Sequence, residues 1–120
     1  MTSRKQNSTN QLNNQVLQQC SVSFTLDKIS GRWKSLILYN LRLGTLRYGQ
    51  LKKIIPLITE KMLAQQLREL EADNLVIRDE KSTVPLHVEY SLTEEGASMT
   101  PIFIAMSEWG KKNNPNFKPC

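Results

Sequence analysis

Apolar positions recur at helical spacing through residues 26–71 and predict three helices. The first is expected from Leu26 to Leu41, where apolar side chains return every three or four positions, as on one buried helix face. A shorter helix is expected from about Tyr48 to Ile55, where Pro56 ends it. The third is predicted from its N-cap, Thr59, to Glu71. The side chains expected in the core are Ile29, Trp33, Leu36, Ile37 and Leu41 of the first helix and Leu51, Ile54 and Ile55 of the second.

The third helix has two unlike edges. At about 100° per residue, one narrow sector holds Leu63, Leu67 and Leu70. The opposite sector holds Lys61, Gln65 and Arg68. Lysine and arginine bond phosphates or guanine edges, and glutamine pairs bidentately with adenine, so this polar edge suits a DNA groove. A solvated helix face has the same composition, and the neighbouring elements must decide between the two interpretations.

Two runs with β-strand character follow the third helix. Val76–Lys81 and His87–Leu92 are predicted strands, and residues 82–86 join them as a loop. A further short strand is a candidate at residues 45–47. Two helices joined by a tight proline-containing turn and followed by a β-hairpin predict a mostly helical α+β fold, the winged helix-turn-helix with a two-stranded wing.

A last apolar stripe lies near the C-terminus. We expect Thr93 to cap a helix there, and Pro101 to kink this helix or to start it a second time. The stripe consists of Met99, Ile102, Phe103, Met106 and Trp109. Because the first three helices already supply a core, we expect the stripe at a dimer interface; the alternative is that it covers its own domain. The predicted organisation is a flexible polar arm at 1–14, a winged helix-turn-helix DNA-binding domain with a C-terminal dimerisation helix at 15–112, and an irregular tail at 113–120. An N-terminal helix is expected to take part in dimerisation as well.

Charge and hydropathy narrow the class of protein. Among 120 residues, 16 Lys and Arg outnumber 11 Asp and Glu, and the net charge of +5 favours a polyanionic partner. The sequence has no run of 18 apolar residues, and its first residues lack the apolar core of a signal peptide. We therefore expect a cytoplasmic protein without a membrane partner.

Residue types that bind metals or carry catalysis are scarce. Cys20 and Cys120 are the two cysteines and His87 is the one histidine, whereas a structural zinc site takes four ligands. The sequence holds no glycine-rich phosphate loop, no nucleophile elbow and no carboxylate pair beside a histidine. We predict that the protein is not an enzyme and that it uses neither a metal nor a cofactor.

Four segments together resemble one protein family. They are Leu26–Lys34, Arg47–Leu51, Thr59–Glu71 and Val88–Thr93. With Trp109-Gly110, they extend over about residues 20 to 110 and resemble the HxlR-type winged-helix transcription regulators, relatives of the MarR group. The chain departs from the family pattern at Ser21, since the family cysteine is commonly followed by proline. It also has Pro85-Leu86 where many members carry two prolines, but neither departure touches the third helix.

The resemblance implies a homodimer on double-stranded DNA. Two recognition helices would enter successive major grooves, about 34 Å apart, on an inverted repeat. The expected DNA contacts are Arg47, Tyr48, Gln50 and Lys52 of the second helix, Thr59, Glu60, Lys61, Gln65 and Arg68 of the third, and Lys81 and His87 near the hairpin tip. Glu60 repels phosphate, so its partner inside a groove is a cytosine amino group.

The two cysteines each admit two interpretations. Cys20 is either a small apolar residue at the edge of a core or, as the resemblance implies, a sensor of oxidants or electrophiles such as quinones and aldehydes. A sensor thiol needs a lowered pKa and partial exposure. Cys120 is either an exposed thiol on the tail or the partner of Cys20 in a disulfide between subunits.

The leading prediction is a dimeric, DNA-binding transcription regulator of the HxlR type that responds to a thiol-reactive small molecule. The alternative is a winged-helix module whose basic edge binds an acidic protein. The polar edge of the third helix favours DNA, because a protein interface would place apolar or aromatic anchors there.

Overall fold

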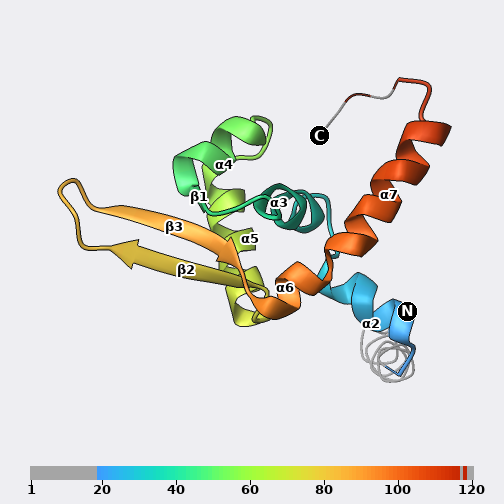
Figure 1. Cartoon of the computed structure of the whole chain (residues 1–120), viewed down its shortest axis with the longest axis horizontal. Helices are drawn as coiled ribbons and strands as arrows, with labels where there is room; N and C mark the ends of the chain where they lie inside the picture. Colours follow the sequence, from blue (N-terminus) through green and yellow to red (C-terminus); the bar gives the residue numbers. More distant parts are fainter. Residues whose placement is uncertain (1–18, 117, 119–120) are drawn as a thin grey trace, which may run out of the picture. The chain divides into compact units, whose positions relative to one another are not determined.

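The computed structural model describes residues 19–116 and 118, and its contacts divide the chain into two units between Ser30 and Gly31. The described part of the first unit contains α2, Ser21–Lys28. The second contains α3 (Lys34–Leu41), β1 (Leu46–Arg47), α4 (Tyr48–Ile54), α5 (Glu60–Ala72), β2 (Val76–Lys81), β3 (His87–Leu92), α6 (Glu94–Ser98) and α7 (Thr100–Asn113) (Figure 1). The predicted arm at 1–14 lies outside the described residues, and the predicted domain bounds stay predictions.

The second unit is a winged helix-turn-helix, as the sequence predicts. β2 and β3 pair antiparallel, in a register that runs from Val76 opposite Leu92 to Lys81 opposite His87. β1 joins the other edge of β3, which makes a three-stranded sheet in the order β1-β3-β2. In Figure 1 the β2–β3 hairpin reaches away from the helices of this unit, as a wing does. None of the described helices is both long enough and apolar enough to cross a membrane.

The inner edge of α5 forms the centre of the core. Leu63, Leu67 and Leu70 are each no more than 1% exposed. They share this core with Ile37 and Leu38 of α3, and α3 packs on α5. Burying one such side chain is worth about 1.5–3 kcal/mol, so the predicted apolar sector fixes how α5 is rotated about its axis.

Two predicted N-caps are confirmed. The Thr59 hydroxyl oxygen accepts a hydrogen bond from the Met62 N–H at 3.1 Å, which starts α5. The Thr93 hydroxyl oxygen accepts from the Gly96 N–H at 2.9 Å, and the same hydroxyl donates to the Asn74 carbonyl at 2.7 Å. Thr93 therefore both starts α6 and ties it to the end of α5.

The prediction of one helix from Leu26 to Leu41 is wrong. The chain forms α2 and α3 instead, and Gly31 between them has a φ of +87°. A left-handed φ is readily adopted by glycine and ends a helix, so Gly31 is a break rather than an interior residue. With a separate start at Lys34, the inner face of α3 is made of Lys34, Ile37, Leu38 and Leu41. Trp33 and Leu36, both predicted in the core, are only half-buried.

One core prediction is wrong, and one alternative that the sequence left open is decided. Ile54 is 44% exposed because α4 stops there and the chain turns at Ile55, whose side chain takes the inner position at 5% exposure. Pro101 lies in the first turn of α7, so the last helical region restarts at Thr100 rather than bending. α6 packs closely on the turn between α5 and β2, since a Cβ on Gly96 would collide with the carbonyl of Leu75.

Candidate nucleic-acid interface

The outer edge of α5 is the candidate reading surface. Lys61, Gln65 and Arg68 are all exposed, opposite the three buried leucines. Thr59 and Glu60 are exposed at the start of the helix, where unpaired backbone N–H groups favour an anion. This arrangement offers two cations and one amide to a groove without uncovering the core.

Side chains of α4 hold the start of α5 in place. The Tyr48 hydroxyl donates to the Glu60 carbonyl at 2.9 Å, and burial, together with the nearby Glu60 carboxylate, raises the pKa of Tyr48. The Lys52 ammonium donates to the Pro56 carbonyl at 3.2 Å and braces the turn. Both residues are predicted DNA contacts, and in the structure they also stabilise the turn and the start of α5.

Two other predicted contacts lie at the beginning of α4. The Gln50 side-chain oxygen accepts a hydrogen bond from the Arg47 N–H at 2.8 Å, which caps this helix. Both side chains are exposed. This hydrogen bond uses the backbone N–H of Arg47 and not its guanidinium. The guanidinium is exposed and can bind a partner.

The sequence interpretation missed an ion pair behind the reading surface. Lys34 is 8% exposed, and its ammonium lies 2.7 Å from Oε1 of Glu69 on α5. The other oxygen of Glu69 accepts from the Gln65 side-chain amide at 3.1 Å. These two bonds, that from Lys34 first, lower the pKa of Glu69. Gln65 is therefore linked through Glu69 to a buried cation of α3.

Helical spacing alone contained a signal for this pair. Lys34 lies three, four and seven positions before Ile37, Leu38 and Leu41, which places it on the core face of α3. A buried ammonium needs a carboxylate partner, because an unpaired charge is costly to remove from water. The sequence prediction treated this region as part of one long helix and placed Ile29 and Trp33 on its inner face. It therefore did not place Lys34 on the core face.

The wing is less basic than the predicted contacts suggest. The Lys81 ammonium lies 2.8 Å from Asp79 and 3.9 Å from Glu89, and Asp79 in particular raises the pKa of Lys81. His87 lies between Thr83 and Glu89, with 3.1 Å from each ring nitrogen to its partner. A phosphate would have to compete with these carboxylates for both side chains.

Cys20 is exposed at the N-cap of α2. Hydrogen bonding from the backbone and hydroxyl of Ser23, and then from the backbone of Val22, lowers the pKa of its thiol. The N-terminal end of a helix stabilises a thiolate in this way. Cys120 lies outside the described residues. Within residues 19–116 and 118, no three His, Cys, Asp or Glu side chains gather as ligands of a metal.

The predicted C-terminal stripe divides into two parts. Met99 and Phe103 are 9% and 4% exposed and belong to the chain's own core. Ile102, Met106 and Trp109 keep 38%, 47% and 70% of their surface exposed. In the first unit, α2 likewise exposes Val22, Phe24 and Leu26. Both helices therefore carry apolar surface that their own units leave uncovered.

Comparison with known proteins decides the family. The model of the HxlR-like helix-turn-helix matches residues 28–117, three quarters of the chain. The chain belongs to the HxlR-like helix-turn-helix family. This HxlR-family protein is 49% identical over 94 residues to the uncharacterized HTH-type transcriptional regulator YybR of Bacillus subtilis, covering 78% of the present chain and 75% of YybR.

Solved structures resemble this HxlR-family protein over most of its length. The redox regulator HypR in its oxidised form is 48% identical, with a TM-score of 0.76 over 79% of this chain and 98% of HypR. The reduced transcriptional regulator YodB from B. subtilis is 31% identical, with a TM-score of 0.69 over 82% of this chain and 98% of YodB. The protein is thus an HxlR-like helix-turn-helix transcriptional regulator and not an enzyme, and DNA is the partner expected of this family.

Proposed function

We propose that this HxlR-family regulator binds an inverted-repeat operator as a homodimer and reads it with α5. The observation that carries the proposal is the exposed row of Lys61, Gln65 and Arg68 on a capped helix whose other edge is buried. A helix of this kind fits the major groove, and two copies related by a twofold axis would contact half-sites about one turn apart.

The side chains of this surface would divide the work. Lys61 and Arg68 bind phosphates or guanine, and Gln65 pairs with an adenine edge. Tyr48, Gln50 and Lys52 of α4 and Arg47, the N-cap of this helix, contact the sugar-phosphate backbone beside the groove. Lys81 and His87 join them only if phosphate replaces their present carboxylate partners.

Dimerisation rests on the apolar surface of α7 and α2. Ile102, Met106 and Trp109 are exposed large apolar side chains of one helix, and burying them against a second copy removes this area from water. α2 adds its own exposed apolar side chains, so both helices are proposed to contribute to the interface.

Cys20 is proposed to switch the regulator. Its thiol is exposed and has a lowered pKa, the two properties of a reactive cysteine. HypR, a solved structure similar to this chain, is described as a redox regulator. A quinone would react by addition of the Cys20 thiolate to a ring carbon, with a proton taken up by the ring, and a bulky adduct at the start of α2 would disturb the dimer.

DNA binding is tested by titrating labelled DNA from upstream of the regulator's own gene, over a salt series and against unrelated competitor DNA. The slope of log affinity against log salt is negative, and each lost phosphate contact reduces its magnitude by about 0.9. We expect Lys61→Ala and Arg68→Ala to weaken binding and flatten this slope, whereas Lys112→Ala, an equal loss of charge on exposed α7, changes neither. If both α5 variants bind like the wild type while remaining folded, α5 is not the reading helix.

A further inference from the structure

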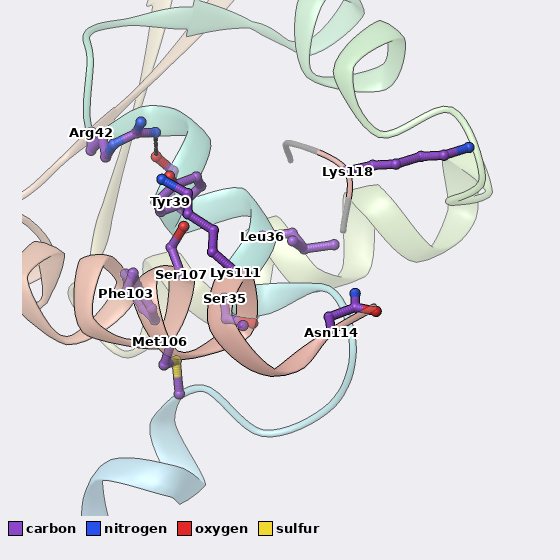
Figure 2. Close-up of a pocket in the computed structure, with 11 residues that line it drawn as sticks. Ser35, Leu36, Tyr39, Arg42, Phe103, Met106, Ser107, Lys111, Asn114 and Lys118 are labelled. Atoms are coloured by element: carbon purple, nitrogen blue, oxygen red, sulfur yellow. Dashed lines mark hydrogen bonds between the residues drawn. The ribbon is translucent and has the colours of Figure 1, made fainter. Parts of the chain in front are cut away.

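A groove of about 490 Å³ lies between α3 and α7, apart from the reading surface (Figure 2). This volume falls in the range of small-molecule sites. Tyr39 and Arg42 line it from α3, and Phe103, Met106 and Ser107 line it from α7. Its walls belong to one unit of the chain, so its shape follows from the packing of α3 on α7.

The two ends of the groove differ in chemistry. Phe103 and Met106 supply apolar surface at one end, and in Figure 2 the side chain of Lys111 extends towards Tyr39 and Arg42 at the other. The Arg42 guanidinium lies over the Tyr39 ring at 3.8 Å, and its Nη1 donates to the Tyr39 carbonyl at 2.8 Å. No carboxylate is found among the described residues that line the groove.

Three cationic side chains line the groove, Arg42, Lys111 and Lys118, and the first two keep donors for a ligand. Arginine has five N–H groups, and within the described part of the chain the Arg42 guanidinium uses one of them, in its bond to the Tyr39 carbonyl. Lys111 faces Glu108 at 3.6 Å, but both side chains are about half exposed or more, and such surface pairs are weak. A carboxylate bound in the groove can therefore draw on both cations at little cost.

Gly110 lies inside α7 and lines the groove. A Cβ built on it would meet nothing within 4 Å, so no close packing requires a glycine here. Because the position lines the groove, a larger side chain is expected to take up part of its open space.

The proposed dimer surface on α7 shares one residue, Met106, with the groove. Ile102 and Trp109 lie seven positions apart on one face of α7, and neither lines the groove. Phe103, Ser107 and Gly110 follow the neighbouring face, which looks onto α3. Met106 lies at the border between the two. A second copy covering the exposed apolar side chains would thus leave the basic end of the groove uncovered.

We propose that this groove binds a small amphipathic anion, with one acidic group at Arg42 and Lys111 and an apolar body of about one ring against Phe103 and Met106. α3 contacts the ligand on one side and holds Glu69 of α5 through Lys34 on the other. We expect α3 and α7 to adopt two spacings that differ in DNA affinity. A ligand that binds one spacing more tightly shifts the protein towards it, and changes DNA affinity by at most the ratio of its affinities for the two spacings. Only this last step rests on the proposed DNA-binding function.

The test uses phenylacetate and its neutral isostere phenylacetamide as probes, titrated into the full-length protein and followed by ligand-observed NMR. We expect phenylacetate to bind saturably and about tenfold tighter than phenylacetamide. Arg42→Gln and Lys111→Gln should each remove most of this preference, whereas Lys112→Gln, which removes a charge outside the groove, should keep it. Because binding is measured without DNA, its outcome is separate from that of the operator experiment.

Gly110→Leu fills the groove without removing any existing contact. We expect it to abolish phenylacetate binding while the variant unfolds at no lower a temperature and keeps the oligomeric state of the wild type. The proposal is overturned if neither probe binds saturably at millimolar concentration, if the two bind equally, or if binding survives Gly110→Leu. Loss of the dimer in Gly110→Leu would overturn it too, because the groove would then be a contact between subunits.

Discussion

Glu69 connects a buried charge to a candidate base contact. One carboxylate oxygen binds the Lys34 ammonium and the other accepts from the Gln65 side chain. A carboxylate can only accept, so the group of Gln65 that faces it is the NH₂. Gln65 then presents its oxygen and its second N–H outward, which is the pattern that an adenine edge requires. Glu69 is in this sense a positioning residue for Gln65.

Replacing Glu69 by glutamine should therefore relax base preference. We expect Glu69→Gln to lose about 1–3 kcal/mol of discrimination at one operator position, the same position at which Gln65→Ala loses it. Binding would be measured to a set of operators, each changed at a single base pair. Equal weakening at every position would show that Glu69 only supports the fold, and an unfolding curve of the variant gives that contribution separately.

Cys20 should react at lower pH than an ordinary thiol. The N–H groups at the start of α2 stabilise the thiolate, so the folded pKa lies below that of the same thiol in the unfolded chain. A lowered pKa means that the thiolate is present, and reactive, at pH values where a free thiol is still protonated. The rate of alkylation by iodoacetamide against pH should have its midpoint at a lower pH in the native protein than in urea.

The same reactivity should control DNA release. A quinone is expected to lower the operator affinity of the wild type and to leave Cys20→Ser unaffected. Cys120→Ser separates an adduct from a disulfide, because only a disulfide between Cys20 and Cys120 needs the second thiol. An unchanged alkylation midpoint on unfolding would remove the basis for Cys20 as a sensor.

At the scale of elements, the two glycines inside α6 and α7 differ in the space around them: Gly96 is crowded and Gly110 is not. Gly96 of α6 faces the Leu75 carbonyl, which an added Cβ would strike, whereas Gly110 of α7 faces open space. We expect Gly96→Ala to lower the free energy of unfolding by about 1–3 kcal/mol through overpacking. Gly110→Ala should raise it by about 0.5–1 kcal/mol through helix propensity. Urea unfolding would measure the stability of both variants, and a stable Gly96→Ala would mean that α6 and the turn between α5 and β2 are not in close contact.

Local signals predicted most elements well. The strands at Val76–Lys81 and His87–Leu92 were predictable to the residue, because β-rich runs bounded by loop residues leave few alternatives. The caps at Thr59 and Thr93 were predictable because a hydroxyl bonds to an N–H only three positions away. The break at Gly31 was not, since a glycine inside an apolar stripe is compatible with either a helix or a turn until its φ is known.

Long-range partners lay beyond sequence reasoning. Nothing in the spacing of Lys34 and Glu69 shows that α3 and α5 cross where these side chains meet. The carboxylates around Lys81 and His87 were visible in the sequence, but their contacts depend on the register of β2 and β3. The candidate reading edge could be predicted because it depends only on the rotation of one helix, which its leucines fix.

At the scale of the whole molecule, the assembly should determine operator affinity. Two half-sites bound by one dimer gain affinity because the second contact is intramolecular. We expect Trp109→Glu to convert the dimer to monomers, through the cost of burying a carboxylate in an apolar interface, and to weaken operator binding by a factor of about a hundred or more. Sedimentation and DNA titration would measure the two effects.

The matched control for this change is Lys112→Glu, which alters charge by two units at an exposed position of the same helix outside the exposed apolar group. It should leave the oligomeric state unchanged. A Trp109→Glu variant that sediments like the wild type would place the subunit contact elsewhere than on α7.

Hydrogen bonds already hold the start of α5 in the free protein. The Thr59 cap, the Tyr48 bond to the Glu60 carbonyl and the Lys52 bond to the Pro56 carbonyl are made without DNA. The loss of chain entropy needed to order this segment is thus met during folding rather than on binding. Binding at α5 should consequently lack the large negative heat-capacity change of coupled folding. Calorimetry of DNA binding over a range of temperatures would measure this heat-capacity change.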